Sequence, residues 1–231
     1  MIMPTLRKPL TTRLHELAVR QDRWMLPLVA AFIICPLSAA LVDPWLALFI
    51  SKHQDAWPIR AAQWATDFGN AWRYLIGLAV LFAGSYLFKN ASQFRYRCVY
   101  VFVTICASSI FTEVLAIIIG RSRPRLLLEQ GIYQLSLLNG FKPYDSLPSS
   151  HAASVLAFVF GAALVFPDAR KVLFTYGLLL AATRILINAH YFGDVVAAAA
   201  VSGATALFLV RYLPEPRKSL PGNVITMRKA R

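Results

Sequence analysis

The sequence predicts an all-α fold: an integral membrane bundle of six transmembrane helices with an interfacial helix on its outer side. Of the 231 residues, 58% are hydrophobic and the mean hydropathy is +0.54, whereas soluble domains contain about 45 to 50% apolar residues. A hydrocarbon core about 30 Å thick requires about 20 helical residues. Because backbone groups in lipid must be satisfied within their own segment, apolar runs of that length are expected to be helices.

Six apolar runs are long enough, or nearly long enough, to cross a membrane. They lie at residues 25–42, 72–88, 98–119, 151–166, 171–188 and 195–213. The run at 151–166 is short, so a five-span bundle with one buried helix is the alternative. The first run follows a basic leader. Because leader and run are both longer than in a secretory signal peptide, we expect a membrane anchor and not a cleaved segment.

Two longer connections separate these runs on the outer side. The first, at about 43–71, carries Trp45, Trp57 and Trp64 among polar residues. Aromatic residues spaced through a mixed polar segment are typical of a helix at the headgroup level, which predicts the interfacial helix. The second, at about 120–150, carries the motifs discussed below.

The distribution of charge predicts the orientation of the bundle. The net charge is +13, and most basic residues flank the spans on one side: Arg7, Lys8, Arg13, Arg20, Arg23, Lys89, Arg95, Arg97, Arg170, Lys171, Arg211, Arg217, Lys218, Arg228, Lys229 and Arg231. By the positive-inside rule this side is cytoplasmic. We therefore interpret the basic residues as topology signals and contacts with anionic lipid, and expect no nucleic-acid partner.

The chain then divides into three parts. Residues 1–24 form a basic cytoplasmic N-terminal segment, residues 25–213 form the six-helix membrane domain, and residues 214–231 form a basic tail whose Pro-rich and charged composition predicts disorder. Three cysteines lie in or beside apolar runs without paired spacing, so they predict neither a disulfide framework nor a metal site.

Three groups of polar residues fall on the outer side of this topology. They are Arg121, Arg123 and Arg125 after the third span, PSSH at 148–151, and Arg184, His190 and Asp194 between the last two spans. Each group has a structural explanation when taken alone: snorkelling arginines, a helix cap, or a histidine at a helix end. Arg184 lies within an apolar run, however, and a charge within the membrane is by default a functional hypothesis.

Together these residues have the chemistry of a phosphate site. Arginine presents a planar fork of donors that matches phosphate oxygens. The helix start at Ser149 and Ser150 adds free N–H groups and a positive dipole end. Two histidines could supply a nucleophile and a proton donor. Asp194 follows His190 by four residues and could fix its tautomer if the segment is helical.

The arrangement resembles the type-2 phosphatidic acid phosphatase family, which carries the motifs KxxxxxxRP, PSGH and SRxxxxxHxxxD. The third motif corresponds to TRILINAHYFGD at 183–194, with Thr in place of Ser. The second corresponds to PSSH at 148–151, with Ser150 in the glycine position. The first corresponds to RP at 123–124, with Ala116 in the lysine position. The six-helix layout is also what this family would imply.

By this resemblance His190 would attack phosphorus to form a phosphohistidine, Asp194 would hold the His190 ring, and His151 would protonate the leaving oxygen and then activate water. The phosphate oxygens would be held by Arg123, Arg184, Ser149 and Ser150, with Arg121 and Arg125 as further candidates. No metal or cofactor is implied, because guanidinium groups would supply the positive charge.

The resemblance implies a lipid phosphatase. The charge distribution predicts both termini in the cytoplasm and the site on the outer face, and the small size and short loops suggest a bacterium, in which that face is the periplasmic side of the inner membrane. Undecaprenyl diphosphate, phosphatidylglycerophosphate, phosphatidic acid and lipid A phosphates are all compatible substrates, and no obligate protein partner is evident. Three alternatives stay open: a lipid phosphotransferase of the same fold, a non-catalytic relative that binds lipid phosphate, and a transporter.

Overall fold

The computed structural model describes residues 22–213, and side chains from residue 29 onward except that of Arg211. Within this range the chain is helical and forms no strand. The helices are α2 Asp22–Leu41, α3 Asp43–Ser51, α4 Trp57–Ala65, α5 Ala71–Gly84, α6 Ser92–Ile119, α7 Pro124–Gln130, α8 Ser150–Val165, α9 Arg170–Leu186 and α10 Phe192–Tyr212, with 3₁₀ turns η1 Thr66–Gly69, η2 Ser85–Leu87 and η3 Pro167–Ala169. The N-terminal segment up to residue 21 and the tail from residue 214 lie outside the described residues.

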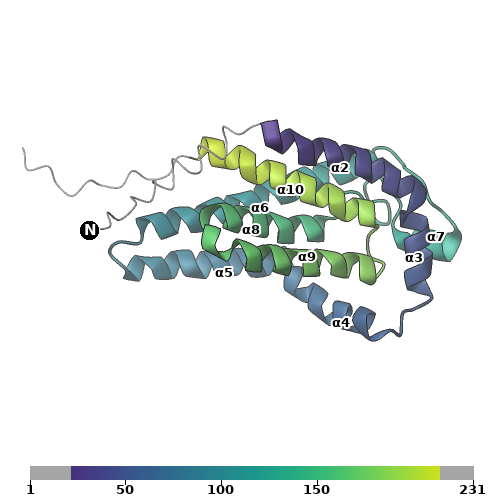
Figure 1. Cartoon of the computed structure of the whole chain (residues 1–231), viewed down its shortest axis with the longest axis horizontal. Coiled ribbons are helices and arrows are strands. Elements are labelled where there is room, and N and C mark those ends of the chain that lie inside the picture. The colour runs from purple at the N-terminus through teal and green to yellow at the C-terminus, as the bar shows by residue number, and fades with distance from the viewer. Residues whose placement is uncertain (1–21, 214–231) are drawn as a thin grey trace, which may run out of the picture.

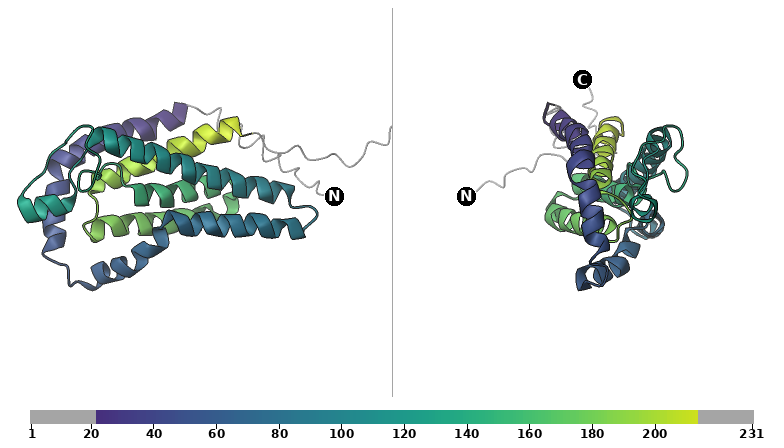
Figure 2. Two further views of the ribbon diagram at one scale, coloured as in Figure 1. Left: turned by 180° about the vertical axis from the view of Figure 1, so that it is seen from behind. Right: turned by 90° about the vertical axis from the view of Figure 1, so that its right-hand side faces the viewer.

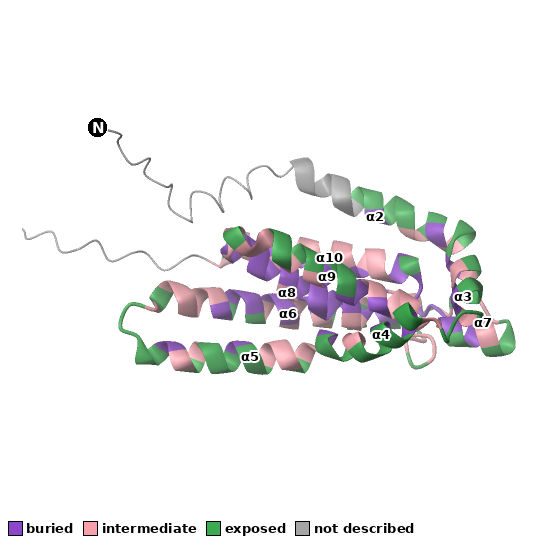
Figure 3. Ribbon diagram, turned by 60° about the horizontal axis from the view of Figure 1, so that its bottom comes forward, coloured by how far each residue is buried: buried purple, intermediate pink, exposed green. Residues whose placement is uncertain are grey.

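The long helices run side by side around α8 (Figure 1). Helix α8 packs against α6, α9 and α10, and α10 in turn lies between α2 and α6 (Figure 2). Twelve of the sixteen residues of α8 are buried, many of them alanines, and Figure 3 shows this buried centre. Small residues let helices approach closely in a membrane protein. Gly177 of α9 illustrates the closeness, because a Cβ there would lie 2.8 Å from a methyl group of Val159.

The outward faces of the bundle are apolar. Large hydrophobic side chains are exposed on α2, α5, α6 and α9, including Phe32, Val80, Ile110 and Leu178. Apolar surface of this extent is typical of a protein that contacts membrane or another partner. The apolar helices thus fit a membrane protein.

The six apolar runs are all helical, but the number of spans is not established by their lengths. Two described helices, α6 and α10, are long and apolar enough to cross a membrane, and the α2–α3 pair, bent by 55°, would make a third. The α5–η2 unit and α8 are apolar but shorter, and α9 begins with the charged residues Arg170 and Lys171. The all-helical prediction is confirmed, and the count of six spans stays a prediction.

The first outer connection folds as α3, α4 and η1. Its three tryptophans are exposed, and α4 packs along α9 (Figure 1). Both α3 and α4 carry proline in the first turn, where the missing N–H costs nothing. The position of this segment at the headgroup level stays a prediction.

The second outer connection begins with a glycine turn. Helix α6 ends at Gly120, which has φ +60° and packs so tightly that a Cβ would collide with the carbonyl of Ser136. The chain then pairs back on itself: the Ser122 N–H donates to the carbonyl of Gln134 at 3.0 Å, and the Ser146 N–H donates to that of Arg121 at 3.1 Å. This folded connection fixes the start of α8 beside the end of α6.

Candidate active site

Polar side chains from separate parts of the chain meet at the end of the bundle where α3 and α7 lie (Figure 1). The connection between α6 and α8 supplies Ser146, the start of α8 supplies Ser149, and the turn between α9 and α10 supplies His190 and Asp194. The Ser149 N–H donates to the Asp194 carbonyl at 3.2 Å, and the His190 ring bonds the Ser146 carbonyl at 2.9 Å. The second and third of the polar groups singled out in the sequence therefore meet.

His190 is buried, and one face of its ring is fixed by the backbone. Its Nδ1 lies 2.9 Å from the Ser146 carbonyl. Because a carbonyl can only accept, Nδ1 carries the proton and Nε2 keeps its lone pair. The Arg184 carbonyl accepts from the N–H groups of both Ala189 and His190 at 3.1 Å, which closes the turn after α9. This turn fixes the position of His190 relative to Arg184 in the third motif.

Asp194 is fully buried and has partners other than the imidazole. Its carboxylate accepts from Arg121 at 2.6 Å, from the Tyr191 N–H at 2.9 Å and from the hydroxyl of Ser146. Its nearest oxygen lies 3.7 Å from His190 Nδ1, which is beyond hydrogen-bonding distance. From the sequence we expected Asp194 to hold the His190 ring, and the two side chains lie close together without a direct hydrogen bond. In the structure Asp194 instead binds the hydroxyl of Ser146, whose carbonyl orients the ring.

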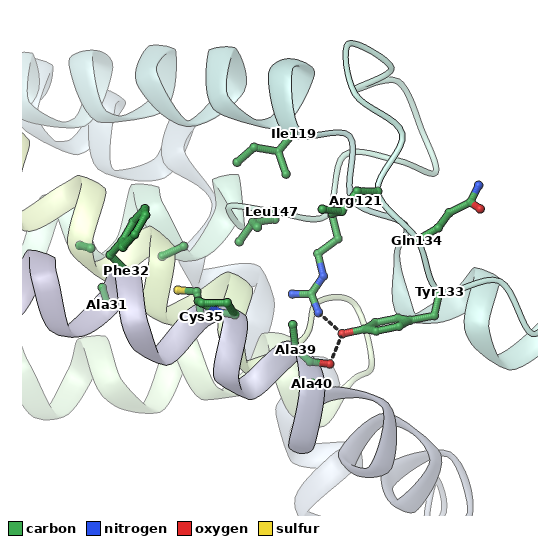
Figure 4. Close-up of a pocket in the computed structure, with 14 residues that line it drawn as sticks. Ala31, Phe32, Cys35, Ala39, Ala40, Ile119, Arg121, Tyr133, Gln134 and Leu147 are labelled. Atoms are coloured by element: carbon green, nitrogen blue, oxygen red, sulfur yellow. Dashed lines mark hydrogen bonds between the residues drawn. The ribbon is translucent and has the colours of Figure 1, made fainter.

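Arg121 is enclosed by protein groups. Its guanidinium bonds Asp43 at 2.8 Å and Asp194 at 2.6 Å, and it also donates to the Tyr133 hydroxyl (Figure 4). Its Cζ atom lies 4.4 Å from the centre of the Tyr191 ring and 5.4 Å from that of the Tyr133 ring. The side chain is only 4% exposed. The geometry makes Arg121 a structural cation and does not support the phosphate contact that the sequence analysis allowed.

The charge of Arg121 is stabilised by these partners. Burial lowers the pKa of Arg121, but attraction to Asp194 and the hydrogen bond to Asp43 outweigh burial and raise this pKa above its ordinary value. The site therefore contains a permanent cation with two buried carboxylates.

Sequence reasoning did not identify Asp43. It is 1% exposed, accepts from the Gly193 N–H at 3.2 Å, and begins α3 immediately before Pro44. A carboxylate in the first turn of a helix is stabilised by the helix dipole. The available signal was an acidic residue followed by proline at the end of an apolar run, but no motif surrounds it.

Arg123 and Arg125, two residues apart, have different environments. Arg123 is mostly buried and makes two hydrogen bonds to Asp145, at 2.6 and 2.7 Å. Burial raises the pKa of Asp145, but the contacts from Arg123 outweigh burial and hold it below its ordinary value. Arg125 lies on α7, is 77% exposed and pairs with Glu129. Arg125 is therefore outside the cluster, because the short helix α7 turns it towards the surface.

Arg184 and His151 converge on Thr66, which sequence reasoning also missed. Arg184 Nη1 donates to the Thr66 hydroxyl at 2.8 Å, and His151 Nε2 donates to the Thr66 carbonyl at 2.8 Å. The Nε of Arg184 is buried and has no partner among the described residues. A buried N–H donor that lacks a partner is available to an anion.

The start of α8 contributes backbone donors. Ser149 is the N-cap, and its hydroxyl accepts from the Ala152 N–H at 3.4 Å. The first N–H groups of a helix have no partner within the helix, so those of Ser150 and His151 are available to an anion. In the described part of the chain, no group of three or more His, Cys, Asp or Glu side chains is arranged to hold a metal ion.

Comparison with known proteins gives a family and two curated relatives. The PAP2 superfamily matches residues 97–218. A lipid A 1-phosphatase of Rhizobium etli is 30% identical over 148 residues, which are 60% of this chain and 64% of the relative. A lipid A 1-phosphatase of Rhizobium johnstonii is 30% identical over 142 residues, which are 57% of this chain and 58% of the relative. The similarity thus spans about three fifths of each relative's length, and no solved structure matches.

Proposed function

The chain belongs to the PAP2 superfamily, and we propose that it is an integral membrane lipid phosphatase acting on the outer face of the inner membrane. One observation carries the proposal. His190 is buried with Nδ1 bound to the Ser146 carbonyl, so that its Nε2 lone pair is free beside the cations Arg123 and Arg184. An oriented nucleophile next to guanidinium groups is what phosphoryl transfer requires.

The proposed reaction has two steps. In the first, the Nε2 lone pair of His190 forms a bond to phosphorus while the bond from phosphorus to the lipid oxygen breaks, and His151 gives that oxygen a proton. In the second, water attacks the phosphohistidine, His151 takes the proton of that water, and the N–P bond breaks to restore neutral His190. The Ser146 carbonyl stabilises the positive charge that the His190 ring carries in between.

Three kinds of donor support binding of the transferred phosphoryl group. The unpartnered Nε of Arg184 and the donors of Arg123 that Asp145 leaves free supply charge, and the N–H groups at the start of α8 supply a positive dipole end. Asp145 already holds Arg123, so we propose that it presents Arg123 to the phosphate in a fixed orientation. Ala116, where the family motif has lysine, is buried on α6 and adds no cation.

The two relatives are named lipid A 1-phosphatases, which favours the phosphate of a lipid A type glycolipid among the four substrate classes. An apolar cavity of about 770 Å³ supports a lipid. It lies among α2, α10 and the connection after α6, with Arg121 and Tyr133 on one side and Phe32 on the other (Figure 4). Pockets of about 300 to 1,000 Å³ hold small-molecule ligands, and we propose that an acyl chain of the substrate lies in this one.

Purified protein should release inorganic phosphate from at least one member of a panel that contains lipid A, phosphatidylglycerophosphate, phosphatidic acid and undecaprenyl diphosphate. Release without any acceptor lipid would distinguish the phosphatase from a phosphotransferase, which requires one. Folded protein that releases no phosphate from any of the four lipids would contradict the proposal. The absence of the motif lysine at Ala116 would then favour the alternative that this protein binds lipid phosphate without hydrolysing it.

Filling the apolar cavity should weaken binding of long-chain lipids. Ala40 lines the cavity from α2 and is exposed, so Ala40→Trp can be accommodated without disturbing the core. Displacing two buried methylene groups costs about 1.6 kcal/mol, so KM should rise roughly tenfold. Leu41→Trp, at an exposed position that does not line the cavity, is the matched control. If Ala40→Trp raised the KM for a short-chain phosphate ester as much as the KM for a long-chain lipid, the cavity would not hold the acyl chain.

The nucleophile should remain active in mild acid. Burial lowers the pKa of His190 and the Asp194 carboxylate offsets burial only in part, so the pKa lies below the ordinary 6.5. Because protonation blocks Nε2, kcat/KM should fall on the acid side only below pH 6.5. NMR titration of ¹⁵N-histidine-labelled protein, with the signal assigned through His190→Ala, measures the same pKa directly. A value above 6.5 would contradict the environment described here.

A further inference from the structure

The segment formed by α4 and η1, residues 57–69, reaches the candidate site from outside the family match at 97–218. It packs along α9 at the end of the bundle where the site lies (Figures 1 and 2). Its point of contact is Thr66, whose carbonyl and hydroxyl bind two different site residues. A single residue of this segment is thus bonded to both the proposed acid–base group and a proposed phosphate ligand.

The contact with Thr66 determines which nitrogen of His151 can react. Nε2 donates to the Thr66 carbonyl at 2.8 Å, so it carries a proton and is occupied. The edge of the ring formed by Nε2 and Cδ2 also lies against Gly69, where a Cβ would collide with Nε2. The free nitrogen is therefore Nδ1. His151 and His190 are held in the same way, each by one backbone carbonyl, but through opposite nitrogens.

The contact with Thr66 also fixes Arg184. Its Nη1 donates to the Thr66 hydroxyl at 2.8 Å, while its buried Nε is left without a partner among the described residues. Holding one end of a guanidinium directs the remaining donors, because the group is planar and rigid. The hydroxyl of Thr66 thereby orients the donor edge of Arg184.

We propose that Thr66 is a positioning residue for the reaction: its carbonyl sets the tautomer of His151 so that Nδ1 transfers the proton, and its hydroxyl orients Arg184 towards the phosphate. This inference rests on the proposed function. In the first step Nδ1–H of protonated His151 passes its proton to the leaving oxygen as the P–O bond breaks. In the second step the Nδ1 lone pair takes a proton from the attacking water. The Thr66 carbonyl stabilises the imidazolium with which the first step begins and which the second step forms.

Gly69→Ala tests the carbonyl contact. The added Cβ would push the His151 ring away from Thr66, so we expect kcat to fall about 10- to 100-fold, which is part of what acid–base catalysis supplies, with KM little changed. The pH profile should change as well, because a ring that has moved loses its contact with the Thr66 carbonyl. It also lies differently relative to Arg184, His190 and Asp67, which are the charged or titratable groups that face it. Gly77→Ala, in α5 with open space around the added Cβ, is the matched control and should leave kcat unchanged.

Thr66→Val tests the hydroxyl contact and keeps the carbonyl. Losing a hydrogen bond to a charged group should raise KM roughly tenfold while the pH profile stays as in the wild type, and Thr66→Ser should restore most of the KM. If Thr66 had a purely structural role, Gly69→Ala, Thr66→Val and Thr66→Ser should all have a lower melting temperature. The effect on kcat would then not be confined to Gly69→Ala, nor the effect on KM to Thr66→Val. If both Gly69→Ala and Thr66→Val had the same kcat, KM and pH profile as the wild type, the inference would be overturned.

A second measurement is independent of turnover. In ¹⁵N-histidine-labelled wild-type protein, the neutral His151 ring should carry its proton on Nε2, and Gly69→Ala should abolish this preference. Failure of the wild type to release phosphate from any lipid would contradict the proposed function alone, since the NMR spectra still determine whether Thr66 sets the tautomer. A His151 ring protonated on Nδ1 would overturn the positioning role even if the protein is an active phosphatase.

Discussion

His190→Ala should abolish phosphate release from every lipid that the wild-type protein hydrolyses. Nε2 of His190 is the atom that would bond to phosphorus, and its removal prevents the covalent intermediate. Loss of a nucleophile costs at least about a thousandfold in rate. The measurement is phosphate release by detergent-purified protein over a range of lipid concentrations.

A matched control separates chemistry from folding. His53→Ala removes an exposed histidine whose Nδ1 bonds the Phe49 carbonyl at 2.8 Å, and it should leave turnover unchanged. His190→Gln keeps most of the buried volume and an amide donor for the Ser146 carbonyl, yet cannot form the intermediate, so it should be folded and inactive. Turnover by His190→Gln above about 1% of the wild-type rate would contradict nucleophilic catalysis by this residue.

Arg121→Met should cause the largest loss of stability. The change leaves Asp43 and Asp194 buried without the guanidinium that separates them, and breaking a buried ion pair from one side costs about 3 to 5 kcal/mol. Activity should fall too, because Asp194 would no longer be held in place to bind the Ser146 hydroxyl. The measurement is the free energy of unfolding in detergent, together with phosphate release.

Arg125→Met is the matched control for Arg121→Met. Arg125 is exposed and pairs with Glu129 within α7, so its loss should cost less than about 1 kcal/mol. Combining Arg121→Met with Asp43→Asn should recover part of the stability, because one unpaired carboxylate becomes neutral. Equal stability of the two arginine variants would show that the buried network is not a major source of stability.

The six long helices were predictable because apolar composition alone specifies them. Each of the six apolar runs is helical, and α6 begins at Ser92, before the predicted residue 98, because Arg95 and Arg97 can extend a helix beyond the apolar run. The number of spans could not be established in the same way. The short α8 has the length of a buried core helix as much as that of a span, and it is in fact buried within the bundle.

The candidate site was only partly visible in the sequence. Motif spacing identified side chains that the structure brings together, such as His190 and Asp194. It could not identify Thr66 or Ser146, because each orients a histidine through a backbone carbonyl, and every residue has one. From the sequence, Arg121 was only a further candidate for a phosphate contact, and its spacing could not show that Asp43, 78 residues away, is its partner in the fold.

The buried ion network also bears on how the protein is made. Synthesis runs from the N-terminus, so Asp43 enters the membrane first, Arg121 follows 78 residues later, and Asp194 follows after another 73. Until the last helix is inserted, Arg121 has at most one of its two carboxylates. The start of α10 therefore supplies the second carboxylate partner of Arg121, and His190 lies in the turn immediately before it. A chain without α10 would leave Arg121 with Asp43 as its one carboxylate partner of the two, so assembly of this network and completion of the candidate site depend on the same helix.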